Sequence, residues 1–483
     1  MILTDILQGI SATIVGNTSI EIADLQFDSR RVHKGSLFVA QVGVHADGHR
    51  YISTAIERGA VAVVCQTMPS EINNDVCYIN VENSDITLGL MSDNFYNHPS
   101  RQLRLVGITG TNGKTTTVTL LQRMFRMAGY HVGLISTIVN KIDEEEHPTN
   151  HTTPDALELN ALLRQMVDAG CQYCFMEVSS HAVVQGRIAG LTFAGGIFSN
   201  ITHDHLDYHK TMQAYIAAKK GFFDSLPREA FALTNIDDRN GMVMVQNCNA
   251  TVKTYSLQHM ADFHTRLIES TFQGLQIEIN GREVWTRLVG RFNAYNLTAI
   301  YATAVLCGIN PDEALLLLSR LEAAEGRFEY VSGRSITAIV DYAHTPDALQ
   351  NVLQTINDIR SERQTLITVV GCGGDRDTTK RPEMAQIAAR MSDKLILTSD
   401  NPRTEDPEKI LNDMENGLSQ EQKWNALRIT DRHQAIRTAC MIAKEGDIIL
   451  VAGKGHEKYQ EVNGVRNHFD DKEELRQWLI DEK

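Results

Sequence analysis

Short apolar runs rich in β-branched residues alternate with segments of helical spacing along most of this chain. This alternation is typical of α/β proteins with largely parallel sheets. Two strands of an N-terminal unit are predicted at 60–64 and 77–81, before Asn97-His98-Pro99-Ser100 interrupts the pattern. Later strands are predicted at 174–178, 336–340, 365–370, 394–398 and 447–451. The pattern therefore predicts an α/β fold class.

The chain is too long for a single hydrophobic core. It has 483 residues, and a typical domain size of about 150 residues suggests three domains. Together with the pattern breaks, this predicts domains at 1–102, 103–330 and 331–483. In the second and third, functional loops are expected at the carboxyl ends of parallel strands.

Composition excludes some classes of function. A formal net charge of -14 argues against a general nucleic-acid binder and against binding to anionic membranes. The N-terminus has an early acid and no basic leader, and no apolar run is long enough to span a membrane. The eight cysteines are scattered, as expected of reduced thiols, and Cys171 and Cys174 have no second pair that would complete a zinc site. We therefore expect a cytoplasmic protein.

One stretch organises the whole chain. A predicted strand from Leu105 runs into a glycine-rich turn and then a helix, the layout of a phosphate-binding loop. Backbone N–H groups would face the phosphates, Lys114 would reach the outer ones, and the Thr115 hydroxyl could bind Mg²⁺. The turn comprises Gly110, Thr111, Asn112, Gly113, Lys114, Thr115 and Thr116. We expect ATP or a similar triphosphate, although Ile108 stands where the general motif has glycine.

Two features of the central region add candidate chemistry. Glu177 interrupts an apolar strand, and a buried carboxylate needs a cation such as Mg²⁺ or, alternatively, a partner such as Arg187. The run at 203–209 holds three histidines and two aspartates, of which one or two, His205 among them, could serve a nucleotide-bound metal. The helix that contains Lys219 and Lys220 would ordinarily be considered solvent-exposed.

In the last third, charged and polar side chains follow the predicted strands. These loops contain Asp341-Tyr342-Ala343-His344, Gly373-Gly374-Asp375-Arg376, Asp400-Asn401-Pro402-Arg403 and Gly453-Lys454-Gly455-His456-Glu457. Because the loops should meet at one sheet edge, we expect them to bind an anionic or zwitterionic ligand.

With these motifs in order, the sequence resembles the Mur ligases of bacterial cell-wall synthesis over nearly its full length. The resemblance rests on the phosphate loop, Met176-Glu177-Val178-Ser179-Ser180-His181, the run at 203–209, Phe292-Asn293-Ala294-Tyr295-Asn296, Gly326-Arg327 and Asp341-Tyr342-Ala343-His344. It is closest to the members that add the third residue of the peptide stem. It implies an N-terminal UDP-binding unit, a central ATPase and a C-terminal Rossmann-like domain.

The resemblance also implies residue roles. Asn296, Arg327 and Asp341 would lie near the adenosine, and Glu177, His205, Thr115 and Lys219, the last as N6-carboxylysine, would hold Mg²⁺. Contacts to the UDP-linked substrate would come from Phe27, Ser29, Val44, His45, Ala46, Thr152, Thr153, Ser179, Gln185 and Arg187. The neighbouring Lys220 leaves the position of the carbamate open by one residue.

Asp400-Asn401-Pro402-Arg403 matches the family members that add meso-diaminopimelate. Diaminopimelate carries a distal carboxylate that lysine lacks, and the Arg403 guanidinium could bind it with two hydrogen bonds. By resemblance, Arg376, Gly453 and Glu457 complete this pocket. The sequence therefore favours diaminopimelate over L-lysine.

The expected reaction is ATP-dependent amide formation. The D-glutamyl γ-carboxylate of UDP-N-acetylmuramoyl-L-alanyl-D-glutamate would form an acyl phosphate, which the amine then captures, with Lys114, Glu177, His205 and Lys219 assisting. The base that deprotonates the amine stays open. Alternatives are the same ligase using L-lysine, a folylpolyglutamate-synthase-like ligase, and a non-catalytic nucleotide switch. We expect a monomer that binds small molecules only.

Overall fold

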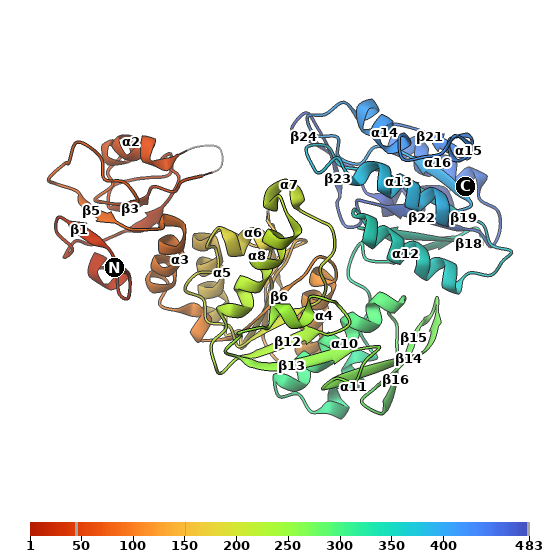
Figure 1. Ribbon diagram of the computed structural model, residues 1–483, viewed down its shortest axis with the longest axis horizontal. Coiled ribbons are helices and arrows are strands. Elements are labelled where there is room, and N and C mark those ends of the chain that lie inside the picture. Colours follow the sequence, from red (N-terminus) through yellow and green to blue (C-terminus); the bar gives the residue numbers. More distant parts are fainter. Residues whose placement is uncertain (44–46, 150, 481–483) are drawn as a thin grey trace.

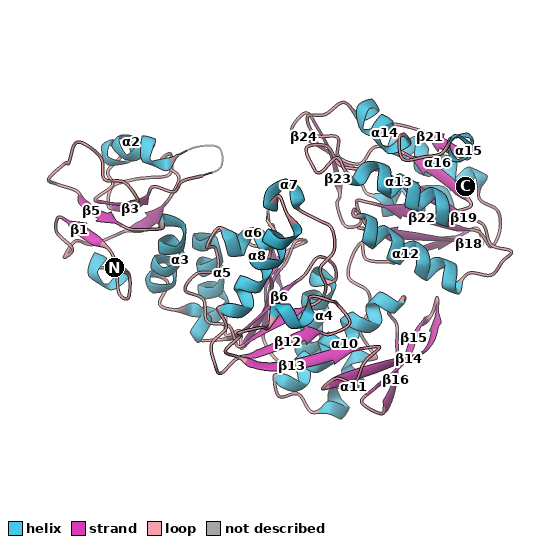
Figure 2. Cartoon of the chain, viewed as in Figure 1, coloured by secondary structure: helices cyan, strands magenta, loops and turns pink. Residues whose placement is uncertain are grey.

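The computed structural model describes residues 1–43, 47–149 and 151–480. The fold class is α/β, as predicted, with one main sheet in each of three domains (Figures 1 and 2). The N-terminal and C-terminal domains lie at opposite ends of the molecule, with the central domain between them (Figure 1).

The N-terminal sheet is parallel except at one edge. Its spatial order is β1 (Thr13–Val15), β5 (Cys77–Asn80), β4 (Ala62–Cys65), β3 (Ser36–Val39) and β2 (Asp24–Gln26), with β1 antiparallel to β5. The helical segments are α1 (Leu3–Ile6), η1 (Gly48–Tyr51), α2 (Ile52–Glu57), α3 (Ser84–Phe95) and η2 (Pro99–Arg101). The helix α3 packs against α5 (Ala156–Asp168) of the central domain, so the two domains share apolar contacts.

The central sheet has eleven strands. Its order is β16 (Arg282–Thr286), β15 (Gly274–Ile279), β14 (Phe263–Thr271), β13 (Thr251–Ser256), β12 (Phe231–Asn235), β11 (Gly195–Phe198), β6 (Arg104–Thr109), β10 (Tyr173–Glu177), β7 (Val132–Ile135), β8 (Asn140–Ile142) and β9 (Glu145–His147). The strands from β14 to β7 are parallel, and antiparallel strands close both edges. An Asn-Gly hairpin joins β15 to β16, with Asn280 and Gly281 both at positive φ.

Helices cover both faces of this sheet, which explains its continuous apolar strands. One face carries α4 (Lys114–Met127), α10 (Arg291–Leu306) and α11 (Pro311–Leu318). The other carries α5 (Ala156–Asp168), α6 (Ser180–Val184), α8 (Met212–Asp224) and α9 (Gly241–Met244), with the short α7 (Leu206–His209) beside α8. The central strands β6 and β10 therefore end between two helical layers, at the position of the predicted phosphate loop.

The C-terminal sheet repeats this design. Its order is β17 (Glu329–Gly333), β18 (Ile336–Asp341), β22 (Ile448–Ala452), β19 (Leu366–Val370), β20 (Lys394–Leu397) and β21 (Ala426–Arg428), parallel except for β17. One face packs on α12 (Pro346–Ile359), α13 (Lys380–Met391) and α14 (Pro407–Glu415), and the other on α16 (Arg432–Ile442) and α17 (Asp471–Leu479). The remaining elements are α15 (Gln420–Asn425) and the hairpin of β23 (Tyr459–Val462) and β24 (Val465–His468).

Candidate active site

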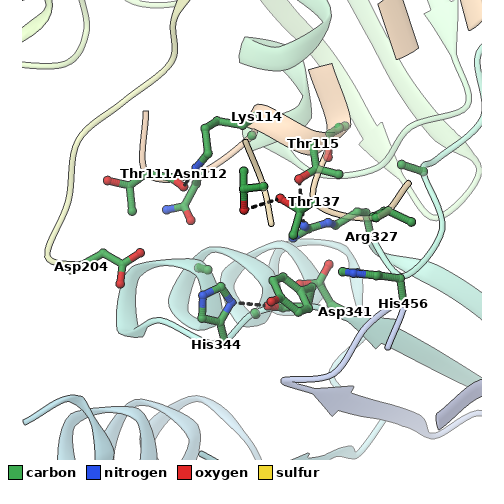
Figure 3. A pocket seen from close by; sticks show the side chains of 18 of the residues that line it. Thr111, Asn112, Lys114, Thr115, Thr137, Asp204, Arg327, Asp341, His344 and His456 are labelled. Atoms are coloured by element: carbon green, nitrogen blue, oxygen red, sulfur yellow. Dashed lines mark hydrogen bonds between the residues drawn. The ribbon is translucent and has the colours of Figure 1, made fainter. Parts of the chain in front are cut away.

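A cavity of about 1210 Å³ lies between the central and C-terminal domains (Figure 3). The carboxyl ends of both parallel sheets open into it, as expected for α/β folds. It is lined by most of the predicted site residues, namely Thr111, Asn112, Gly113, Lys114, Thr115, Thr116, Thr152, Glu177, Ser179, His205, Lys219, Asn296, Arg327, Asp341, Arg376, Asp400, Asn401, Arg403, Gly453 and Glu457. The cavity thus joins the predicted nucleotide residues to the predicted amino-acid residues.

The phosphate loop, residues 110–116, connects β6 to α4. Lys114 Nζ donates to the carbonyls of Gly110 and Thr111, both at 2.9 Å, which curls its side chain over the loop. Gly110 and Gly113 have φ of +151° and +86°, and a Cβ would lie 2.0 Å from Ser199 Oγ or 2.5 Å from Asn296 Oδ1. Only glycine fits at both positions. Glycine at both positions therefore sets the conformation of this loop.

Glu177 ends β10 beside this loop and is fully buried. Its carboxylate accepts hydrogen bonds from the backbone N–H of Thr137 at 2.8 Å and from the Thr137 hydroxyl at 3.1 Å. The alternative partner, Arg187, lies elsewhere and donates to the Thr153 carbonyl and the Gln185 side chain. Burial lowers the pKa of Lys114, while the nearby Glu177 opposes that shift. The alternative partner Arg187 was therefore wrong, and Mg²⁺ as the partner of Glu177 stays a prediction.

Lys219 is buried, whereas lysines of such a helix are ordinarily exposed. Its Nζ donates to the Gly110 carbonyl at 2.8 Å and lies 4.7 Å from the centre of the Tyr215 ring. Burial lowers the Lys219 pKa well below its usual value, and Lys114 contributes to the shift. By contrast, Lys220 Nζ pairs with Asp224 on the helix surface. Only Lys219 reaches the phosphate loop, with a side chain that favours the neutral amine.

Of the run at 203–209, Asp204, His205 and Asp207 line the cavity. His205 Nε2 lies 3.4 Å from Asp204 Oδ2, and burial lowers the pKa of His205 to about 4. His209 turns inward, where its Nε2 lies 2.8 Å from the Ser180 hydroxyl. The described residues hold no group of three or more His, Cys, Asp or Glu side chains placed to bind a metal ion.

The predicted adenosine residues lie along the other side of the loop. Arg327 donates to the Thr115 hydroxyl at 3.2 Å and stacks 4.5 Å from the centre of the Tyr342 ring. The Asp341 carboxylate accepts from the Phe328 N–H at 2.7 Å, and burial raises its pKa to about 6 although Arg327 opposes the shift. Asn296 Nδ2 donates to Asn293 on the same helix.

The amino-acid loops, residues 371–377, 399–405 and 452–457, follow β19, β20 and β22. Asn401 Nδ2 donates to Glu457 Oε2 at 2.7 Å, and Lys454 Nζ donates to Asn401 Oδ1 at 3.0 Å. Arg403 donates to the Gly374 carbonyl at 2.7 Å, Arg376 lines the same end of the cavity, and Pro402 lies in the second loop. This end therefore offers guanidinium groups for carboxylates and a carboxylate, Glu457, for an ammonium.

Two contacts cross the cavity mouth. Asn112 Nδ2, from the phosphate loop, donates to Asp347 Oδ2 at 2.7 Å at the start of α12, and His203 Nε2 lies 3.4 Å from Asp377 Oδ2. The C-terminal domain is thus held directly against the phosphate loop.

The residues predicted to contact the UDP-linked substrate are divided between two places. Thr152, Thr153, Ser179, Gln185 and Arg187 form one hydrogen-bonded group around β10, in which Thr153 Oγ1 donates to the Glu177 carbonyl. Phe27 and Ser29 lie in the N-terminal domain, away from the cavity. The remaining three, Val44, His45 and Ala46, fall outside the described residues.

Sequence reasoning missed several residues of the cavity. Thr137 lies in a segment without a charged cluster, and Asp347 ends a loop that the sequence did indicate, but the contacts of both join distant segments and could not be read from the sequence. Asp204, His344 and His456 stand in motifs that the sequence did indicate, but no role was assigned to them there. Cys171 and Cys174 are free, buried thiols, as expected.

Comparisons with known proteins agree with this architecture. Three family models match the chain: "Mur ligase family, catalytic domain" at 21–94, "Mur ligase middle domain" at 108–304 and "Mur ligase, glutamate ligase domain" at 326–455. The UDP-N-acetylmuramoyl-L-alanyl-D-glutamate--2,6-diaminopimelate ligase of Cytophaga hutchinsonii is 56% identical over 97% of this chain and 96% of its own length.

Solved structures are also similar. A UDP-N-acetylmuramoyl-L-alanyl-D-glutamate--2,6-diaminopimelate ligase has a TM-score of 0.70 at 33% identity, covering 99% of this chain and 98% of that one. The MurF ligase of Thermotoga maritima, solved in complex with ADP, has a TM-score of 0.60 at 19% identity, covering 89% of this chain and 93% of that one, which is a likeness of fold.

Proposed function

This chain belongs to the Mur ligase family, and from that premise we propose that it joins meso-diaminopimelate to the D-glutamyl γ-carboxylate of UDP-N-acetylmuramoyl-L-alanyl-D-glutamate, converting ATP to ADP and phosphate. The observation that supports this most is the single cavity with the phosphate loop on one wall and the amino-acid loops on the other. The proposed domain limits are 1–102 for the UDP-linked substrate, 103–330 for ATP and 331–483 for the amino acid.

The chemistry requires activation of a carboxylate. An oxide ion is too poor a leaving group for direct amide formation, so the carboxylate first takes the γ-phosphoryl group of ATP. Lys114 and the N-terminus of α4 would stabilise the negative charge on the transferred phosphoryl group. The buried Asn401, Lys454 and Glu457 network would position the amino acid, and closure of the cavity would keep water from the acyl phosphate.

The residues present fit a Mg²⁺ ion that the nucleotide helps to bind. Glu177 is a buried carboxylate close to Lys114, and the Thr115 hydroxyl faces the same cavity, the oxygen donors that Mg²⁺ prefers beside phosphates. We propose Thr115, Glu177 and His205 as ligands, with Lys219 as a carbamate. The ion would supply positive charge to the phosphoryl group. Burial lowers the pKa of Lys219, and the neutral amine that this shift favours is the form that reacts with CO₂.

For the amino acid, Arg403 supports diaminopimelate over L-lysine because a guanidinium can bind the distal carboxylate that lysine lacks. Asn296, Arg327 and Asp341 are proposed to contact the adenosine. The group around Thr152 and Arg187, together with Phe27, Ser29 and residues 44–46, is proposed to contact the UDP-linked substrate.

The structure has, among its described residues, no helix long and apolar enough to cross a membrane. We propose a cytoplasmic site of action, which the eight free cysteines support because reducing compartments keep thiols unpaired. A monomer is proposed since one chain supplies both walls of the cavity.

A phosphate-release assay tests the function. With ATP, Mg²⁺ and the UDP-muramoyl-dipeptide, we expect turnover with meso-diaminopimelate and little with L-lysine. Turnover with a folate and glutamate instead would support the folylpolyglutamate-synthase-like alternative, and nucleotide binding without phosphate release would support a switch.

A further inference from the structure

The proposed reaction needs a base, because the attacking nitrogen begins as an ammonium without a lone pair. His344 stands on the loop between β18 and α12, three residues before Asp347, which contacts the phosphate loop. It lines the cavity that holds both the phosphate loop and the amino-acid loops. We propose that His344 is the base that deprotonates this amine, an inference that rests on the proposed ligase function.

Hydrogen bonding leaves one nitrogen of His344 available. Nδ1 lies 2.9 Å from the Tyr342 carbonyl oxygen, and a carbonyl can only accept. Nδ1 must therefore carry the proton, and Nε2 keeps its lone pair. In Figure 3 the His344 ring lies on the side of the cavity that also holds Asp204.

The charges around His344 suit a base whose pKa rises when the substrates bind. Burial lowers its pKa to about 4, Lys380 and Arg327 add to the shift, and Asp204 and the Tyr342 carbonyl oppose it. The ring is therefore neutral at neutral pH. A triphosphate or acyl phosphate in the cavity would offset the two cations and raise the pKa, so that the imidazole could hold a proton when the amine is ready to attack.

Other groups in the cavity are less suitable. His456 also lies beside the Tyr342 ring, with ring centres 4.9 Å apart against 4.6 Å for His344, but burial and Arg327 lower the pKa of His456 to about 3, below that of His344. Glu457 is already bonded to Asn401 and Lys454, and His205 is a proposed metal ligand. Among these groups, His344 is the one whose proton a backbone carbonyl fixes on Nδ1, which leaves Nε2 as the acceptor.

The step balances without a further reactant. One ammonium proton passes to Nε2, and the freed lone pair forms the C–N bond at the acyl carbon while the carbonyl π electrons move to oxygen. These electrons return as the C–O bond to phosphate breaks, and phosphate leaves with that bonding pair. The leaving phosphate takes the second nitrogen-bound proton, and the imidazolium later returns its proton to water.

Two amines test the proposal on the full enzyme. Hydroxylamine is a weaker base than an alkyl amine and is neutral at neutral pH, so it should capture the acyl phosphate without help. For His344→Gln, we expect amide formation with meso-diaminopimelate to fall by about 100-fold or more, while hydroxamate formation stays near the wild-type rate. His131→Gln, an exposed histidine beside Asp143 and outside the cavity, should resemble wild type in both assays.

Equal loss with both amines, or no loss with diaminopimelate, would overturn the assignment. His344→Ala provides a second arm, in which added imidazole should restore amide formation in a concentration-dependent way, and absence of rescue would count against a base. If wild-type enzyme produced neither ADP nor hydroxamate, the ligase function itself would fail, independently of His344.

Discussion

The phosphate loop and the amino-acid loops face each other across one cavity but are built differently. The phosphate loop is a single stretch whose lysine bonds to carbonyls within the same loop. The amino-acid loops come from three separate segments. The side chains of Asn401, Lys454 and Glu457 join two of them, and Arg403 joins the third through the Gly374 carbonyl. The wall formed by the phosphate loop therefore depends on local backbone conformation, whereas the wall formed by the amino-acid loops depends on side-chain bonds between segments. Substitutions in the two walls should therefore have different kinds of effect.

The largest effect is expected at the locally built wall. Lys114→Ala removes the cation beside the transferred phosphoryl group, and turnover should fall by roughly 1,000-fold or more because such charge stabilisation dominates phosphoryl transfer. Steady-state ADP release measures this, and urea unfolding should show an intact fold. Near-normal turnover would exclude the phosphate loop from the mechanism.

The next largest effect is expected at Lys219, and the adjacent Lys220 provides the control. Lys219→Ala should lower turnover by about 100-fold, as expected for loss of a group that acts on the transferred phosphoryl group, whereas Lys220→Ala should leave it nearly unchanged because Lys220 pairs with Asp224 outside the cavity. Carbon-13 NMR with labelled bicarbonate should show a carbamate signal in wild type and in Lys220→Ala only. A signal that persists in Lys219→Ala would place the modification elsewhere.

In the wall formed by the amino-acid loops, Arg403→Ala should weaken the binding of diaminopimelate only. Loss of a charge-assisted, two-bonded contact of about 1.5–3 kcal/mol should raise the KM for diaminopimelate roughly 10- to 100-fold, with the KM for ATP unchanged. Arg390→Ala, an exposed arginine of α13 outside the cavity, is the matched control. Equal weakening of both substrates would contradict an amino-acid role for Arg403.

The smallest effect concerns the contact between the walls. Loss of the bond from Asn112 to Asp347 should cost about 1 kcal/mol, or roughly fivefold in kcat/KM for ATP. Asn112→Ala and Asp347→Ala should then be non-additive in a double-mutant cycle. Asn351→Ala is the control, because Asn351 also donates to Asp347 but from within α12. Fully additive losses would mean that the bond does not couple the domains.

Much of the fold was predictable from local pattern. The strands at 174–178, 365–370 and 394–398 were predicted to within about one residue of β10, β19 and β20, because apolar runs between turn residues are a short-range signal. The turn at Asn280-Gly281 was predictable for the same reason, since both residues tolerate positive φ. The phosphate loop was likewise apparent, because its glycines, its lysine and the helix start lie within a few residues.

What the sequence alone determined, then, were the elements, the phosphate loop and the charged loops at strand ends. Only the tertiary structure decided that Glu177 bonds to Thr137 rather than Arg187, that Lys219 is buried while Lys220 is not, and that Asp347 contacts Asn112. The physical reason is that burial and hydrogen-bond partners depend on which distant segments pack together, whereas strand and turn formation depend on neighbouring residues.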